Sequence, residues 1–211
     1  MIEYGRLNFL FAVESRRSRM RSAPLLALLF VTLGSAAADL IPAEYVREKY
    51  VAPPDAPSSI VVAGPAEPGE RFVVTGRILD GNKPLAGVSI YVFHTDAKGL
   101  YARDGANNDE NARLHGAMRS DAEGRYRFET IRPRGYDNEP AHVHYVVIAP
   151  GYKPRMFDLW LADDPILVKR RKDGLPDLWF ESAPGRIAIR PVTRDAQGTW
   201  HATRDLEMLR Q

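Results

Sequence analysis

Residues 121–149 carry the sequence DAEGRYRFETIRPRGYDNEPAHVHYVVIA, which decides the fold. A turn signal over Asp121–Gly124 precedes a strand pattern over Arg125–Ile131, and a strongly β-branched run follows over His142–Ala149. Short strands at this spacing predict a mainly β chain: an antiparallel β-sandwich with long loops and little helix. The same alternation predicts five further strands, over Arg71–Leu79, Val88–His94, Phe157–Leu161, Arg186–Val192 and Thr199–Leu206.

A polar stretch over residues 101–116 interrupts this pattern and shows neither helical nor strand periodicity. Loops of that length inside a compact domain are uncommon unless they serve a function. We therefore interpret this stretch as a functional loop.

The first 38 residues have the pattern of a secretory signal. Four arginines between residues 16 and 21 precede an apolar stretch over Ala23–Leu33, and small residues follow up to Ala38. We expect cleavage between Ala38 and Asp39, and hence an exported protein, periplasmic or secreted. The alternative is an N-terminal helix packed on the domain. Met20 is a second candidate start, which would leave residues 1–19 upstream of the true start.

Composition restricts the partners and the chemistry. The chain has no cysteine, which excludes disulfides, zinc thiolates and cysteine nucleophiles. No apolar run reaches about 18 residues, so no membrane span is expected in the mature chain. The leader holds five Arg and two Glu, a net of +3 against +2 for the whole chain, which leaves −1 for the rest. That charge gives no reason to expect nucleic acid as a partner. We divide the remainder into a Pro-rich arm over residues 39–70 and a sandwich domain over residues 71–211.

His142 and His144 are candidates for a metal site. They lie two apart in a predicted strand, so both imidazoles project from one face. Tyr136 lies six residues upstream, within reach of that face, and Tyr101 is a further candidate. Imidazole nitrogen and phenolate oxygen together suit Fe(III). Taken alone, a His-x-His pair is more often two half-buried strand residues than a metal site.

The surrounding motifs resemble those of the intradiol ring-cleavage dioxygenases, non-haem Fe(III) enzymes that open catechols between the two hydroxyls. The resemblance covers about residues 71–165 and implies the sandwich fold of that family. It is carried by GRILD at 76–80, PLAGV at 84–88, GLY at 99–101, SDAEGRYRF at 120–128, TIRPRGY at 130–136 and PAHVH at 140–144.

The resemblance implies that Tyr101 and Tyr136 are tyrosinate ligands of Fe(III), and that His142 and His144 are its imidazole ligands. It further implies that Tyr136 leaves the metal when a catechol binds and accepts one of its protons. The implied reactants are a small aromatic diol and O2, and the implied products are of the muconic acid type.

Two positions depart from the family pattern. Glu139 stands three residues before the first histidine, where the family commonly has Arg, and Asp158 stands where Gln is usual. We expect both acids near the substrate, where they would disfavour an anionic one; Arg132, Arg134 or Arg155 are candidates to neutralise them. Two alternatives to catalysis are a non-catalytic exported sandwich module and a metal-binding relic of the family. The sequence leaves the oligomeric state open, a homo-oligomer included.

Overall fold

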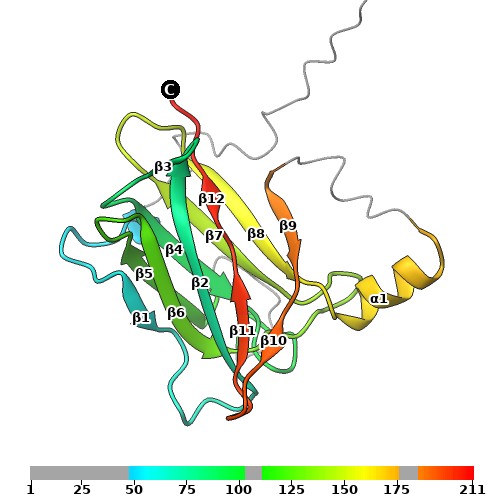
Figure 1. Ribbon diagram of the computed structural model, residues 1–211. Coiled ribbons are helices and arrows are strands. Elements are labelled where there is room, and N and C mark those ends of the chain that lie inside the picture. The colour runs from blue at the N-terminus through cyan, green and yellow to red at the C-terminus, as the bar shows by residue number, and fades with distance from the viewer. Residues whose placement is uncertain (1–47, 103–110, 176–184) are drawn as a thin grey trace, which may run out of the picture. The chain divides into compact units, whose positions relative to one another are not determined.

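The computed structural model describes residues 48–102, 111–175 and 185–211, all within one compact unit that covers Ser35–Gln211 (Figure 1). The predicted leader lies outside the described residues. Within the described part, no helix is long and apolar enough to cross a membrane. The described residues form a 3₁₀ turn, η2 (Glu48–Tyr50), one helix, α1 (Pro165–Lys172), and twelve strands: β1 (Ser59–Val61), β2 (Arg71–Asp80), β3 (Lys83–Pro84), β4 (Ser89–His94), β5 (Leu114–Arg119), β6 (Arg125–Ile131), β7 (His142–Ile148), β8 (Arg155–Leu161), β9 (Ile187–Arg190), β10 (Thr193–Arg194), β11 (Trp200–Thr203) and β12 (Leu206–Glu207).

The strands form two sheets packed face to face, which confirms the predicted β-sandwich. One sheet has seven strands, with the order β1-β6-β2-β11-β10 and with β3 and β12 also paired to β2. The other has five strands in the order β5-β4-β7-β8-β9. Inward-facing apolar residues of both sheets fill the space between them, among them Val74 and Phe128 from one sheet and Val92 and Tyr145 from the other. Alternation with period two places these side chains in the core.

Some pairings are parallel, unlike the antiparallel sandwich that the sequence predicts. The pairs β2/β6, β4/β5, β4/β7 and β7/β8 are antiparallel, whereas β1/β6, β2/β11, β2/β12 and β8/β9 are parallel. A short hairpin forces antiparallel pairing, but a parallel pair requires a longer crossover. Helix α1 provides that crossover between β8 and β9. Asp164 begins the helix by accepting a hydrogen bond from the backbone N–H of Ile166, with Pro165 at the first helical position.

Two parts of the chain contain more regular structure than the sequence suggests. The Pro-rich arm contributes β1, which adds to the edge of the seven-stranded sheet beside β6, and it buries Ala52 and Ala63. The stretch interpreted as a loop over residues 101–116 ends early, because β5 begins at Leu114 and pairs with β4. Residues 103–110 of that stretch lie outside the described residues.

Candidate metal centre

Strand β7 carries the two histidines on the face opposite the sandwich core. Val143, Tyr145 and Val147 point inward and are fully buried among the core residues. His142 and His144 take the alternate positions, as the period of a strand requires. The sequence-based placement of both imidazoles on one face is therefore confirmed.

Three donor atoms meet above this face. His142 Nε2 lies 2.8 Å from His144 Nε2, and Tyr101 Oη lies 2.9 Å from His144 Nε2 and 3.4 Å from His142 Nε2. Two ligand atoms that each lie about 2.1 Å from one ion, at a right angle, are about 3 Å apart. The separations between these three atoms are therefore those expected of atoms that share a cation.

The other ring nitrogens show why a cation fits. His142 Nδ1 donates to the Pro140 carbonyl at 2.6 Å, and His144 Nδ1 donates to the Asp158 carboxylate at 2.6 Å. In the neutral form each Nε2 then presents a lone pair, and the two lone pairs face each other across 2.8 Å. The Tyr101 hydroxyl has a single proton to give, whereas a cation would stabilise both lone pairs and the phenol oxygen together.

Burial keeps the His142 imidazole in a form that can bind metal. Burial, and then the repulsion of His144, lower the pKa of His142 to about 4, so its imidazole is neutral near pH 7. Tyr101 is only 2% exposed. Within the described residues, no three side chains of His, Cys, Asp or Glu gather in metal-binding positions. The donor set consists instead of two imidazoles and phenol oxygen.

Tyr136 lies beside these atoms on a tight turn. Its carbonyl accepts from Glu139 N–H at 2.7 Å, its own N–H donates to the Glu139 carbonyl at 3.1 Å, and Asp137 between them has a left-handed backbone, with φ of 47°. The Tyr136 ring centroid lies 5.6 Å from that of Tyr101, edge to face, and 5.8 Å from that of His142. All four predicted ligand residues thus come together, with Tyr136 half-buried at the margin.

The segments that carry the two tyrosines are joined to each other. Thr95 Oγ1 donates to the Arg134 carbonyl at 2.7 Å. Gly99 packs so closely on Gly135 that a Cβ atom there would lie 2.8 Å from the Gly135 oxygen. Gly99 also has a positive φ, of 84°, which a side chain would strain. These contacts fix Tyr101 and Tyr136, 35 residues apart in sequence, on one side of the sheet.

The two acids that depart from the family pattern lie in different places. Glu139 is half-buried on the turn after Tyr136, and burial together with the negative charge of Asp158 raises the pKa of its carboxyl. Asp158 lies opposite His144 in the β7/β8 register, behind its imidazole. Burial alone would raise the pKa of Asp158. The hydrogen bond from His144 and the charges of His144 and Arg186 outweigh burial, so the pKa of this carboxyl lies below its usual value.

The positively charged side chain beside Asp158 is that of Arg186, which the sequence analysis did not propose as its partner. Arg186 Nε lies 3.3 Å from Asp158 Oδ2, and the backbone N–H of Asp158 donates to the Arg186 carbonyl. Of the candidates considered from sequence, Arg132 pairs with Asp163, and Arg155 donates to the Glu207 carbonyl. Arg186 precedes β9, and only the parallel β8/β9 pairing places it next to Asp158; no sequence motif predicts that contact.

A third histidine lies on the opposite face of the same sheet. His94 ends β4, points into the sandwich and is fully buried. Its Nδ1 donates to the Thr95 carbonyl at 2.7 Å, and its Nε2 accepts from Thr130 Oγ1 at 2.7 Å. Burial lowers the pKa of His94 to about 4. It links the two sheets and does not join the metal-ligand candidates.

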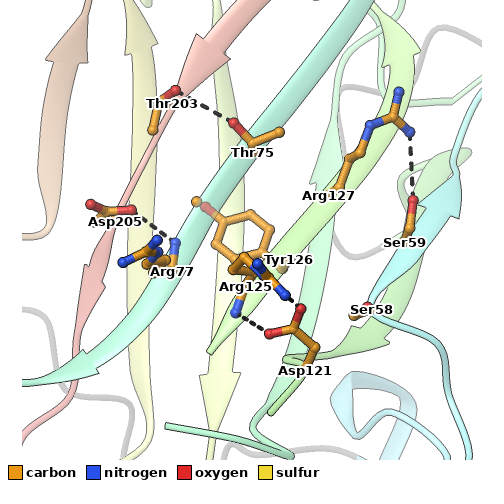
Figure 2. A pocket seen from close by; sticks show the side chains of 11 residues that line it. Ser58, Ser59, Thr75, Arg77, Asp121, Arg125, Tyr126, Arg127, Thr203 and Asp205 are labelled. Atoms are coloured by element: carbon orange, nitrogen blue, oxygen red, sulfur yellow. Dashed lines mark hydrogen bonds and ion pairs between the residues drawn. The ribbon is translucent and has the colours of Figure 1, made fainter. Parts of the chain in front are cut away.

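A pocket of about 500 Å³ lies elsewhere, on the outer face of the seven-stranded sheet (Figure 2). Figure 2 shows that its polar side chains are engaged with one another: Arg125 binds Asp121, and Arg127 reaches Ser59. The pocket shares no residue with the cluster of imidazoles and phenols. The chemistry suggested by the donor atoms therefore belongs to the five-stranded sheet.

Comparison with known proteins gives a consistent result. Residues 44–173 match the profile of a family described as Dioxygenase. The beta chain of protocatechuate 3,4-dioxygenase from Burkholderia cepacia is 36% identical over 139 residues, 60% of this chain and 56% of that protein. Catechol 1,2-dioxygenase 2 from Acinetobacter lwoffii is 31% identical over 121 residues, 48% of this chain and 43% of that protein. The chain thus spans about half the length of these curated relatives.

Solved structures show the same fold. The dioxygenase domain of a dioxygenase carbohydrate-binding protein fusion from Streptomyces sp. SirexAA-E aligns with a TM-score of 0.56 at 23% identity, over 78% of this chain and 96% of that one. Catechol 1,2-dioxygenase from Acinetobacter sp. ADP1 aligns with a TM-score of 0.57 at 23% identity, over 76% of this chain and 60% of that one. At this identity the likeness concerns the fold alone.

Proposed function

The chain belongs to the intradiol ring-cleavage dioxygenase family, and from that premise we propose that it opens catechol-type aromatic diols with O2. Both oxygen atoms of O2 enter the product, a muconic acid-type dicarboxylic acid. The observation that carries this proposal is the convergence of two imidazole Nε2 atoms and a phenol oxygen within 2.8–3.4 Å, with both Nδ1 atoms already bonded. A β-sandwich that only binds a partner has no need of this arrangement.

We propose Fe(III) as the cofactor, held by Tyr101, Tyr136, His142 and His144. Phenolate oxygen is a hard anionic donor, and two of them suit a small trivalent cation better than a soft or monovalent one. When bound, ferric iron would draw electron density from a chelated diolate and so expose a ring carbon to attack by O2.

The two tyrosines differ in their surroundings, which supports different roles. Tyr101 is buried and lies against both histidines, so it suits a permanent ligand. Tyr136 is half-buried on a turn, and its ring packs edge to face with that of Tyr101. We assign Tyr136 Oη the acceptance of one diol proton, because a group at the margin can move away without opening the core.

We further propose that the substrate is an uncharged catechol or hydroxyquinol and not a carboxylated one. Glu139 pairs with Tyr136 across a tight turn, and the negative charge of Asp158 acts on its half-buried carboxyl. A substrate carboxylate about 5 Å from an ionised acid, at an effective dielectric near 20, would be opposed by roughly 3 kcal/mol. That opposition corresponds to a loss of affinity on the order of a hundredfold.

Iron content and colour test the proposal. The purified protein should hold about one iron per chain and show a visible tyrosinate-to-iron absorption band, and it should turn over catechol with consumption of O2. His142→Ala and His144→Ala should each lose most of the iron. The matched control is His201→Ala, since His201 is bonded to Asp195 on the other sheet. Unchanged iron content in both site variants would contradict the ligand assignment.

Two other results would favour the alternatives. A colourless protein without iron would indicate a non-catalytic sandwich module. A coloured protein that turns over no diol of the catechol, hydroxyquinol or protocatechuate type would indicate a metal-binding relic.

We also propose export to the periplasm or the medium, on the strength of the arginine-rich and apolar segments before Asp39.

A further inference from the structure

The two histidines of the site have unlike partners. His142 Nδ1 donates to a neutral backbone carbonyl, that of Pro140, whereas His144 Nδ1 donates to the carboxylate of Asp158 at 2.6 Å. A carboxylate behind an imidazole fixes its tautomer and makes the far nitrogen a stronger donor. The site is therefore asymmetric: of the two neutral imidazoles, His144 has the Nε2 lone pair that binds a metal more strongly.

The fold holds this carboxylate firmly. Asp158 lies directly opposite His144 in the antiparallel β7/β8 register, and its side chain is only 5% exposed. On its other side Arg186 lies 3.3 Å from Oδ2, at the start of the parallel β8/β9 pairing. Strand β7 thus contributes the imidazole, strand β8 the carboxylate and the residue just before β9 the guanidinium, and each group contacts the next.

We propose that Asp158 is a positioning residue that fixes His144 with its proton on Nδ1 and strengthens Nε2 as a donor, and that Arg186 moderates this effect. The part that concerns iron rests on the proposed function; the part that concerns the tautomer does not. A more strongly donating nitrogen stabilises Fe(III) relative to Fe(II), because the higher charge gains more from it. The buried negative charge of Asp158 acts in the same direction.

The role differs from contact with substrate, which the sequence suggested for Asp158. A carboxylate that accepts a hydrogen bond from Nδ1 lies on the side of the imidazole away from Nε2. It therefore reaches the reacting atoms only through His144. Glu139 lies on the Tyr136 turn, where the charges of Asp158 and His144 act on its carboxyl.

Two site variants change the charges behind His144, and a third variant is the control. Asp158→Asn keeps an acceptor for Nδ1–H and removes the charge; we expect iron affinity to fall about 10- to 100-fold and the reduction potential of bound iron to rise. Arg186→Gln removes the opposing charge, so the potential should fall. The matched control is Asp195→Asn, which alters a carboxylate–histidine pair of 2.8 Å at His201 on the other sheet and should change neither quantity.

Opposite shifts in the two site variants support the proposal, because a loss of structure alone would move both in one direction. Shifts of the same sign, or an unchanged potential in Asp158→Asn, would overturn it. The nitrogen-15 spectrum of the iron-free protein adds a reading that needs no metal. His144 should carry its proton on Nδ1 in the unmodified protein and in Asp158→Asn, and should move toward Nε2–H in Asp158→Leu. A proton on Nε2 in the unmodified protein would overturn the proposal. Because this measurement needs no metal, it tests the role of Asp158 even if the chain holds no iron and the proposed function fails.

Discussion

Acid should destabilise the iron-free protein through His94, the fully buried histidine between the two sheets. Its pKa in the folded state is about 4, against about 6.5 for an exposed imidazole, because burial disfavours the charged form. The unfolded chain therefore binds a proton first as the pH falls. The stability that neutral His94 contributes is complete above pH 6.5 and is lost progressively down to pH 4.

The magnitude follows from the two pKa values. Each unit of separation is worth 1.36 kcal/mol, so lowering the pH from 7 to 5 should remove about 2 kcal/mol of unfolding free energy through His94 alone. The variant His94→Gln cannot bind this proton. Between pH 7 and pH 5 it should therefore lose about 2 kcal/mol less unfolding free energy than the unmodified protein. At pH 7 the variant should itself be less stable by about 1–3 kcal/mol, because its amide does not restore both hydrogen bonds of the imidazole.

The assay is urea unfolding of iron-free protein at pH 7 and at pH 5. His142, whose pKa is also about 4, is present in both proteins and cancels in the comparison. His201→Gln serves as the control, since His201 is 42% exposed at its side chain and bonded to Asp195. An equal loss of stability in His94→Gln and in the unmodified protein would refute the reasoning.

Three further predictions concern the site and the leader. Tyr136→Phe should retain more iron than either histidine variant yet lose turnover, because a phenyl ring cannot accept the diol proton; near-normal turnover would remove Tyr136 from the mechanism. In steady-state kinetics, Glu139→Arg should raise the ratio of kcat/KM for protocatechuate to kcat/KM for catechol by up to about a hundredfold. A preference of the unmodified enzyme for protocatechuate would contradict the role given to Glu139. Protein from a secreting host should begin near Asp39 on N-terminal sequencing; an intact leader in the cytoplasmic fraction would disprove export.

The sequence by itself determined the local geometry. Alternation with period two in residues 142–148 places both histidines on one face and Val143 and Tyr145 in the core, because a strand allows no other arrangement. The turn and strand signals likewise predicted a β-sandwich. The order of the tyrosines and of the His-x-His motif, which resembles that of the intradiol dioxygenases, predicted the four candidate ligand residues.

Only the tertiary structure decided which side chains meet. Tyr101 reaches the histidines because Gly99 packs against Gly135, a contact between segments that local periodicity cannot bring together. Asp158 lies behind His144, and Arg186 beside Asp158, because of the register of three strands; a shift of one residue would turn each side chain to the other face. Periodicity fixes the face on which a residue lies, whereas register and long-range packing fix its neighbours, and the chemistry of this site depends on those neighbours.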